Sequence, residues 1–477
     1  MKATLYNRLL MLLLTVLMVF VPVACSDNAA TETEAGTGSD KTNETVTEQV
    51  SETDRKDPSG HAGKTFDEIL GERDTDIPDT AATISNGSTD TPVASDLDLE
   101  NIFSERDLRQ SPDLSEAELI IVSDNETLTI SEEGIYQITG TATNATILVE
   151  ADKKAKVQLI LDNVNITNDD FPAIYIVSAD KCFVTLMGNS TLSVTGTFRA
   201  DGDTNTDAVI FSKEDLTLNG TGSLAINSAQ GNGVSCKDDL VITGGTYAVT
   251  TALDSFEAND SIAIADGTFT ITTQKDGFHS ENDSDNTLGF IFIQDGTFTV
   301  NAKSDGIRGT TFVRIDGGTF KITGSEGIEA TYILINDGEL DVYGSDDGLN
   351  ASRKSKAIAT PTITVNGGHL KVEVGPGDTD AIDANGDIYV NGGTIEVTSG
   401  MSSFDYDNKA VYNGGTIIIN GEQVDSIPES MMPGFGGFGG RPDGGNGFGG
   451  WSGDGNNFGG RPDGDTGNGG RGRGRNN

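Results

Sequence analysis

The chain has 477 residues and a formal net charge of -43, with 74 acidic against 31 basic side chains. A surface this negative repels phosphate backbones, so we expect no nucleic-acid partner, and an acidic ligand would require a bridging cation. With 61 glycines, 12 prolines and 6% aromatic residues, the composition is typical of a repetitive β protein rather than of a helical enzyme.

The first 25 residues have the features of an export signal. Lys2 and Arg8 precede an apolar run that ends in a Val-Ala-Cys cleavage site. A cysteine at this place, followed by a long polar stretch, is typical of a bacterial lipoprotein. We predict a signal peptide over residues 1–25, acylation at Cys25, and an exported cell-surface or extracytoplasmic protein that meets the membrane only through its lipid anchor. Ordinary secretion and an uncleaved membrane anchor are the alternatives.

Two segments of biased composition flank a repetitive centre. Residues 26–114 are rich in Thr, Glu, Asp and Ser and have little apolar content, which predicts a disordered acidic linker. Residues 426–477 are Gly-rich and predict a disordered low-complexity tail. Between them, residues 115–425 are predicted to form one folded domain. Its two cysteines, Cys182 and Cys236, are expected to be buried free thiols.

Short strand-like fragments recur along this central domain. Each copy reads Gly, usually Thr, an aromatic or aliphatic residue, any residue, and Val or Ile, as in Gly-Thr-Phe-Thr-Ile at 267–271. The repeat glycines stand 20 to 30 residues apart and most often 22, at positions 222, 245, 267, 296, 318, 338, 368, 393 and 415. We interpret the longer spacings as loop insertions, one of them at 280–287.

A period near 22 with strands this short indicates how the repeats are arranged. Alternation puts Phe269 and Ile271 on one face and Thr268 on the other, and stacking equivalent strands about 4.8 Å apart gives every strand a partner and the apolar sides one interior. Three strands and three turns use up one period. We therefore predict an all-β, right-handed, single-stranded parallel β-helix of ~22-residue rungs, and we expect the protein to be a monomer. A leucine-rich repeat shares the period, but its leucine pattern is absent.

The inward and outward sides of these strands form two columns of like residues. The inward aromatic column is expected to be an internal stack that contains Tyr247, Phe269, Phe298 and Phe320. The outward threonines superficially resemble an ice-binding ladder, but their column breaks at Glu339 and His369, so we interpret it as ordinary β surface.

The second half of each repeat carries the candidate site. It reads acid, small residue, apolar residue, any residue, small residue, and the acid occupies the same slot in six consecutive copies. Carboxylates stacked about 4.8 Å apart repel by roughly 3–4 kcal/mol per pair at an effective dielectric near 20, and a proton, solvent or a bound cation must relieve this repulsion. Oxygen-only ligands favour Ca²⁺, for which the small residue would leave room. The predicted metal ligands are Asp254, Glu257, Asp276, Asp305, Glu326, Glu329, Asp346, Asp347, Asp380, Asp383 and Asp405. A solvated acidic edge is the alternative.

The repeats, together with the segments 159–166 and 212–218, resemble the bacterial carbohydrate-binding, pectate-lyase-like β-helix family over about residues 117–423. The resemblance implies a pectate-lyase-like fold, calcium as cofactor, and binding of cellulose and polygalacturonate without clear cleavage activity. It also implies that Asp254, Asp276, Asp305 and Asp347 are calcium ligands, whereas Glu326 and Ser402 depart from the aspartate of the pattern.

Three functions follow as hypotheses. The first is a non-catalytic binder of acidic plant or cell-surface polysaccharide, in which Ca²⁺ bridges the protein to uronate carboxylates. The second is a calcium-dependent pectate lyase, whose base would come from Lys275, Lys303 or Arg308, although these side chains also serve to neutralise the neighbouring acids. The third is a structural surface protein or adhesin. We favour the binder and leave catalysis open.

Overall fold

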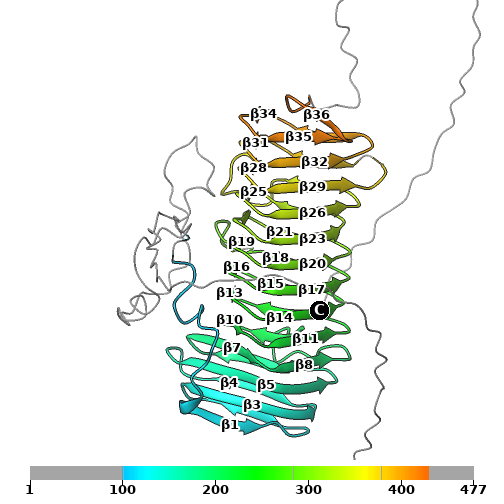
Figure 1. Ribbon diagram of the computed structural model, residues 1–477. Coiled ribbons are helices and arrows are strands. Elements are labelled where there is room, and N and C mark those ends of the chain that lie inside the picture. The colour runs from blue at the N-terminus through cyan, green and yellow to red at the C-terminus, as the bar shows by residue number, and fades with distance from the viewer. Residues whose placement is uncertain (1–98, 100, 283, 378, 429–477) are drawn as a thin grey trace, which may run out of the picture. The chain divides into compact units, whose positions relative to one another are not determined.

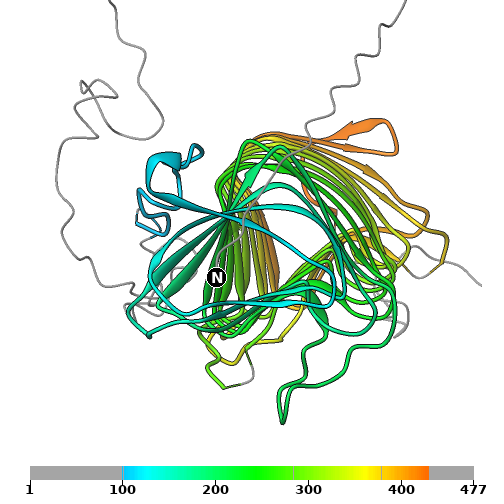
Figure 2. The ribbon, with the colours of Figure 1, turned by 90° about the horizontal axis from the view of Figure 1, so that it is seen from below.

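The computed structural model describes residues 99, 101–282, 284–377 and 379–428. Within these residues the chain is all-β apart from a short 3-10 helix, η2 (Leu114–Glu116). Parallel strands stack in successive layers to give a β-helix-like fold (Figures 1 and 2). The predicted signal peptide, Cys25 and nearly all of the Gly-rich tail lie outside the described residues. None of the described helices is long and apolar enough to cross a membrane.

The strands form three columns. Column 1 consists of β1 (Ala117–Ile121), β3 (Gly134–Thr143), β5 (Lys156–Asn168), β7 (Lys181–Met187), β10 (Asp215–Gly220), β13 (Asp239–Ile242), β16 (Ser261–Ile264), β19 (Phe290–Ile293), β22 (Phe312–Ile315), β25 (Tyr332–Ile335), β28 (Thr362–Val365), β31 (Asp387–Val390) and β34 (Lys409–Tyr412). Column 2 consists of β8 (Asn189–Val194), β11 (Ser223–Ser228), β14 (Thr246–Thr251), β17 (Thr268–Thr273), β20 (Thr297–Asn301), β23 (Thr319–Gly324), β26 (Glu339–Gly344), β29 (His369–Val374), β32 (Thr394–Thr398), β35 (Thr416–Ile419) and the antiparallel β36 (Glu422–Val424). Column 3 consists of β2 (Thr127–Ile130), β4 (Thr146–Glu150), β6 (Ile174–Ser178), β9 (Ala208–Ser212), β12 (Asn232–Cys236), β15 (Phe256–Ala258), β18 (Phe278–Ser280), β21 (Ile307–Gly309), β24 (Ile328–Ala330), β27 (Leu349–Ala351), β30 (Asp380–Ala384) and β33 (Ser402–Tyr406).

The register of column 2 follows the sequence repeat. Thr246 pairs with Thr268, and Thr268 pairs with Thr297 although 29 residues separate them. The extra residues lie in the connection between β18 and β19, so the insertion does not disturb the pairing. Alternate residues of β17 are exposed and buried, as the alternation predicts.

The inward aromatic column is confirmed as an internal stack. Tyr247, Phe269, Phe298 and Phe320 are all almost fully buried. Successive ring centroids lie 5.1, 4.8 and 4.5 Å apart, with interplanar angles of 12°, 7° and 2°. Cys182 and Cys236 are also buried and free, and burial raises the pKa of the Cys182 thiol to about 12.

The backbone explains why glycine recurs at the start of each column 2 strand. Eight of the nine repeat glycines have positive φ angles, from 77° at Gly368 to 153° at Gly267. A side chain at Gly393 would also place its Cβ 2.7 Å from the carbonyl oxygen of Gly367. Glycine therefore permits both the left-handed turn and the close approach of successive rungs.

A row of amide side chains joins four successive rungs at a turn. Asn366 Nδ2 donates to Asn336 Oδ1, Asn391 to Asn366, and Asn413 to Asn391, each over 2.7 Å. The first member, Asn336, donates to Asp316 Oδ1 over 2.6 Å. Asn336 and Asn366 are 30 residues apart in sequence, yet their side chains are hydrogen-bonded. The row therefore keeps equivalent turns aligned from rung to rung although the connections between them differ in length.

The predicted linker over residues 26–114 extends too far. Residues 99 and 101–113, here called the strap, lie along the outside of column 1 (Figures 1 and 2). Leu99 and Phe103 pack with an apolar cluster on the outer side of β19, β22 and β25, and the Arg106 guanidinium lies 4.3 Å from the ring centroid of Phe183. These few apolar residues are surrounded in sequence by polar and charged residues. The average composition of residues 26–114 therefore gave no indication that part of this segment packs on the folded domain.

Asp107 fixes the strap through a buried ion pair. Its side chain is 1% exposed, its Oδ1 lies 3.0 Å from Lys181 Nζ, and it accepts hydrogen bonds from Thr217 and Ser104. Burial opposes ionisation, but Lys181 and these hydroxyls hold the pKa of Asp107 below its ordinary value.

The substitution Asp107→Asn is expected to lower the free energy of unfolding by about 2 kcal/mol, because it keeps the hydrogen-bond acceptor but removes the charge opposite the Lys181 ammonium. Urea unfolding would measure the change. Glu105→Ala, at an exposed position of the same strap, is the control and should change stability by less than about 0.5 kcal/mol. Equal effects of the two variants would contradict the assignment of the ion pair.

Candidate functional site

The six acids of the repeat stack on column 3, as the sequence predicts. We call Asp254, Asp276, Asp305, Glu326, Asp347 and Asp380 the acid ladder. Each stands two residues before a set of mutually paired apolar residues in β15, β18, β21, β24, β27 and β30. Main-chain hydrogen bonds of 2.9–3.1 Å fix this stacking, from the amides of Gly277, Gly306, Gly327 and Gly348 to the carbonyls of Asp305, Glu326, Asp347 and Asp380.

A second row runs beside the ladder, one outward position along each strand. Its members pair in register from rung to rung, and we call them the adjacent row: Glu257, His279, Arg308, Glu329, Asn350, Asp383 and Asp405. The ladder and the adjacent row therefore bring most of the predicted ligands together on one edge of the coil.

In three of the six ladder acids, one carboxylate oxygen has a structural role. Asp254 Oδ1 accepts the backbone amide of Asp276 over 3.0 Å, and Asp276 Oδ1 accepts that of Asp305 over 2.9 Å. Asp347 does the same for Asp380 over 3.0 Å. Asn232, one rung before the ladder, uses its neutral amide oxygen for the same contact with Asp254. This role does not require a charge, so the charge itself requires another explanation.

Basic side chains neutralise the first half of the ladder. Lys275 Nζ lies 2.7 Å from Asp254 Oδ2, and His279 Nδ1 lies 3.2 Å from the same oxygen. His279 Nδ1 is also 3.7 Å from Asp276 Oδ2, and Arg308 lies 3.8 Å from both Asp276 and Asp305. These acids are almost fully buried, so the protein supplies its own cations to them.

The pKa values agree with this assignment. Burial alone would lower the pKa of His279, but its hydrogen bonds to Asp254 and Glu281 raise it to about 9, so the ring carries a charge at neutral pH. Burial would raise the pKa of Asp254, but His279 and Lys275 hold it below its ordinary value. His279 was not among the predicted site residues. Its position in the repeat could have identified it, because the charged residues Glu257 and Arg308 occupy the equivalent position in the neighbouring repeats.

The middle of the ladder has a different character. Asp305, Glu326 and Glu329 offer carboxylate oxygens that all lie within 4.8 Å of one another. Burial and the charges of Glu329 and Asp305 raise the pKa of Glu326 to about 8, and its Oε2 is buried without a hydrogen-bond partner among the described residues. Burial and the charge of Asp276 raise the pKa of Asp305 to about 6. Glu329 has two basic partners, Arg308 Nε at 3.4 Å and Lys354 Nζ at 2.5 Å.

The last rungs of the ladder lack basic partners. Burial raises the pKa of Asp347 to about 6, and burial together with Asp347, Asp380 and Asp405 raises the pKa of Asp383 to about 7. Within the described ranges, no lysine, arginine or histidine forms an ion pair with Asp347, Asp380 or Asp383. Negative charge therefore accumulates from Glu326 onwards.

Two of the predicted ligands have other surroundings. Glu257 Oε2 accepts hydrogen bonds from Asn232 and Ser235 and lies 3.6 Å from Lys237 Nζ, so local donors already satisfy it. Asp346 is exposed beside Asp347. Both residues therefore lie apart from the oxygen-only group around Glu326.

The small residue after each acid serves packing rather than access for an ion. A Cβ at Gly306 would lie 2.2 Å from Ile322 Cγ2, and one at Gly327 would lie 2.1 Å from Val342 Cγ1. These glycines face the interior, where column 2 side chains occupy the space. Our interpretation that they leave room beside the carboxylate was wrong.

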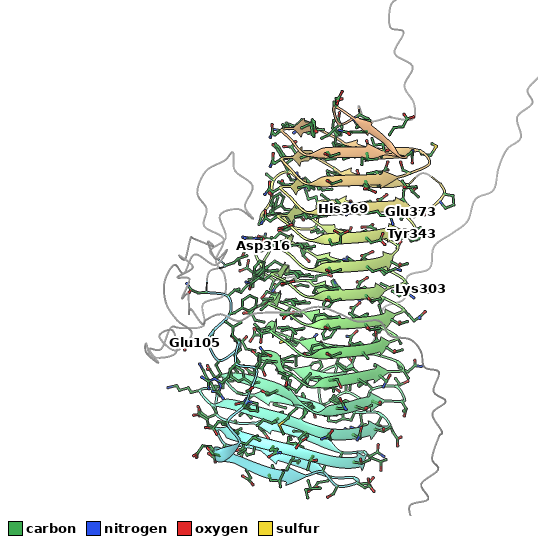
Figure 3. The ribbon with its side chains drawn as sticks, in the orientation of Figure 1. Glu105, Lys303, Asp316, Tyr343, His369 and Glu373 are labelled. Carbon is green, nitrogen blue, oxygen red and sulfur yellow. The ribbon has the colours of Figure 1, made fainter. Side chains whose placement is uncertain are left out.

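The three candidate bases are placed differently from one another. Lys275 and Arg308 form the ion pairs described above, and although burial opposes their charge, the neighbouring acids raise the pKa of both. Lys303 is exposed in the turn after β20 and protrudes at the edge of the coil (Figure 3). Charge neutralisation thus accounts for Lys275 and Arg308, and a lyase reaction stays an untested prediction.

The sequence profile of the family described as carbohydrate-binding domain-containing protein matches residues 124–381, which is more than half of the chain and includes the whole acid ladder. The chain belongs to this family. A carbohydrate-binding domain-containing protein of Acetivibrio thermocellus is 36% identical over 132 residues, which make up 27% of this chain and 46% of the relative. The chain thus spans less than half the length of that curated relative. A solved structure titled polysaccharide lyase-like protein from C. thermocellum, gadolinium derivative, is 29% identical, with a TM-score of 0.43, and the match covers 46% of this chain and 95% of that one.

Proposed function

We propose that this carbohydrate-binding protein is an exported, Cys25-anchored receptor for acidic polysaccharide, and that Ca²⁺ bound on the acid ladder bridges it to uronate carboxylates. The observation that carries the proposal is the group Asp305, Glu326 and Glu329, whose oxygens lie within 4.8 Å of one another. Without a cation, a chain of net charge -43 would repel a polyanionic glycan.

The donor set fits calcium. All three side chains offer oxygen, the ligand that Ca²⁺ prefers, and Glu326 Oε2 is a buried acceptor without a donor in the described part of the chain. Ca²⁺ takes about 6–8 oxygen ligands, so three carboxylates would leave positions for water and for a carboxylate of the glycan. Asp347, Asp380 and Asp383 would extend the same binding region towards the last rungs.

The first half of the ladder is a poorer place for the ion. Lys275, His279 and Arg308 already balance Asp254 and Asp276, and a metal would have to displace a charged ring and an ammonium. We therefore assign calcium to the rungs from Asp305 onwards. There the ion would compete with Arg308 and Lys354 for Asp305 and Glu329, but Glu326 and the later ladder acids form no ion pair with a basic side chain in the described ranges. From the resemblance to pectate lyases we propose only calcium-dependent binding of the glycan and no cleavage reaction.

Retention of the full chain on immobilised polygalacturonate tests the proposal. We expect retention in millimolar Ca²⁺ and its loss in excess chelator. Glu326→Gln should weaken retention about tenfold, which corresponds to roughly 1.4 kcal/mol. Glu257→Gln is the matched control, because this residue lies in the same edge but is satisfied by local donors. Equal retention with and without chelator would rule out the calcium bridge.

A further inference from the structure

Seven of the asparagines that the structure describes are followed directly by glycine. At this pair the backbone amide of the glycine can attack the preceding side chain, because glycine has no Cβ to shield its nitrogen. The attack closes a succinimide ring, which water opens to aspartate or isoaspartate. The asparagines concerned are Asn219, Asn232, Asn366, Asn385, Asn391, Asn413 and Asn420.

Hydrogen bonds hold the side-chain amide of all these asparagines except Asn385. Asn413 is bonded through its nitrogen. To close the ring, the side chain must turn until its carbonyl carbon meets the next backbone amide, and this rotation breaks the bonds that hold it. The structure therefore slows the reaction at these positions. Five of the side chains are bonded through both oxygen and nitrogen: Asn219, Asn232, Asn366, Asn391 and Asn420.

The side chain of Asn385 is free to make this rotation. It is exposed and has no hydrogen-bond partner among the residues that the structure describes. The amide of Gly386 donates to the carbonyl of Ala384 over 2.5 Å, which closes a three-residue turn. Only this one hydrogen bond has to open before the amide nitrogen can reach the side chain of Asn385.

The turn that holds Asn385 lies between β30 and β31, at the end of the coil where the ladder acids lack basic partners. Asn385 follows Ala384, and Asp407 follows Tyr406, which pairs with Ala384 on the next rung. The amides of Asn385 and Asp407 donate to the carbonyls of Ala351 and Ala384, over 2.9 and 3.2 Å. The two residues thus occupy equivalent positions, and the fold already accepts a carboxylate at this position.

We propose that Asn385 is a site of spontaneous deamidation, at which the folded protein converts a neutral side chain into an acid. The nitrogen of Gly386 loses its proton and bonds to Cγ of Asn385. The bond between Cγ and Nδ2 breaks, and Nδ2 leaves with that proton as ammonia. Water then adds to one of the two ring carbonyls and gives aspartate or isoaspartate. The reaction needs only water, and it is independent of the calcium-dependent binding of a glycan.

The modification adds one negative charge per molecule as the protein ages. The new carboxylate would stand about 4.8 Å along the coil from the position of Asp407, in rungs where neighbouring acids already raise the pKa of Asp383 to about 7. The charge therefore increases where the described part of the chain offers the ladder acids no basic partner.

The test is incubation of the folded full chain at mildly alkaline pH, followed by digestion at acidic pH and fragment mass spectrometry of each asparagine–glycine pair. We expect Asn385 to convert about tenfold faster than Asn366 and Asn391, because two hydrogen bonds hold each of these side chains. Asn413, which has one such bond, should convert at an intermediate rate. In urea the differences among these four sites should disappear.

The matched control is Asn385→Gln, whose longer side chain would have to close a larger ring. This variant should show no conversion at position 385 and unchanged rates at Asn366, Asn391 and Asn413. Circular dichroism verifies that it is folded. Conversion of Asn385 no faster than that of Asn366 and Asn391 in the folded chain would overturn the proposal. So would conversion of the glutamine at the same rate, because direct hydrolysis would then replace ring closure.

Discussion

Phe298→Ala is expected to lower the free energy of unfolding of the β domain by about 3–5 kcal/mol, the cost of removing a large side chain from a closed core. The Phe298 ring lies between Phe269, at a centroid distance of 4.8 Å, and Phe320, at 4.5 Å. It also meets the edge of Phe278 at 5.9 Å. Rungs above and below hold the backbone in register, so the cavity cannot collapse freely.

Urea unfolding monitored by circular dichroism would measure this loss. Thr299→Ala is the control, because it removes an exposed outward side chain from the same strand and should change stability by less than about 0.5 kcal/mol. Phe298→Leu should lie between the two. A loss below about 1 kcal/mol for Phe298→Ala would contradict the internal stack.

The second large effect is a fall in melting temperature with rising pH when calcium is removed. Unfolded carboxyl groups ionise near pH 4, whereas in the folded chain burial and neighbouring acids raise the pKa of Glu326 to about 8 and that of Asp383 to about 7. Between these values the folded state binds more protons than the unfolded state, so the free energy of unfolding decreases as pH rises. His279, with a pKa raised to about 9, acts in the same direction above pH 6.5.

Calcium should counteract this fall. At a free concentration one hundred times its dissociation constant, binding to the folded state alone adds about 2.7 kcal/mol, or roughly 4 °C for a domain of about 310 residues. The measurement is calorimetry at pH 5 and pH 8, with calcium and with chelator. Glu326→Gln should melt higher than the parent chain at pH 8 in chelator and gain less from calcium. If calcium did not change the melting temperature at either pH, this result would contradict calcium binding on the acid ladder.

The repeat predicted the fold because every rung uses the same local pattern of short strands and turns. The glycines with positive φ, the inward phenylalanines and the outward threonines all follow from alternation and spacing within about twenty residues. The strap escaped prediction because its contacts join positions far apart in sequence, such as Asp107 with Lys181 and Thr217. The strap contains no copy of the repeat, and its amino-acid composition does not indicate which distant residues it contacts.

The sequence predicted a row of stacked acids. It did not predict that the acids of the first rungs have basic partners whereas those of the last rungs lack them. The slot of the acid could be read from the repeat, and the register confirms that the six slots stack. Whether a given carboxylate is neutralised depends largely on the adjacent row, where the consecutive basic residues His279 and Arg308 are followed by acids and an amide. Their contacts cross from one rung to the next, so the sequence alone could not show which acids remain without a basic partner.

The amide row from Asn336 to Asn413 has a direction. Each side chain donates towards the preceding turn, and the series ends at Asp316, whose carboxylate can only accept. Arg314 holds that carboxylate through two hydrogen bonds of 2.8 and 2.7 Å. A single fixed anion therefore determines the orientation of four amides over the four turns that follow it. If a neutral amide replaced it, the whole series would be free to reverse together, donors becoming acceptors along its length.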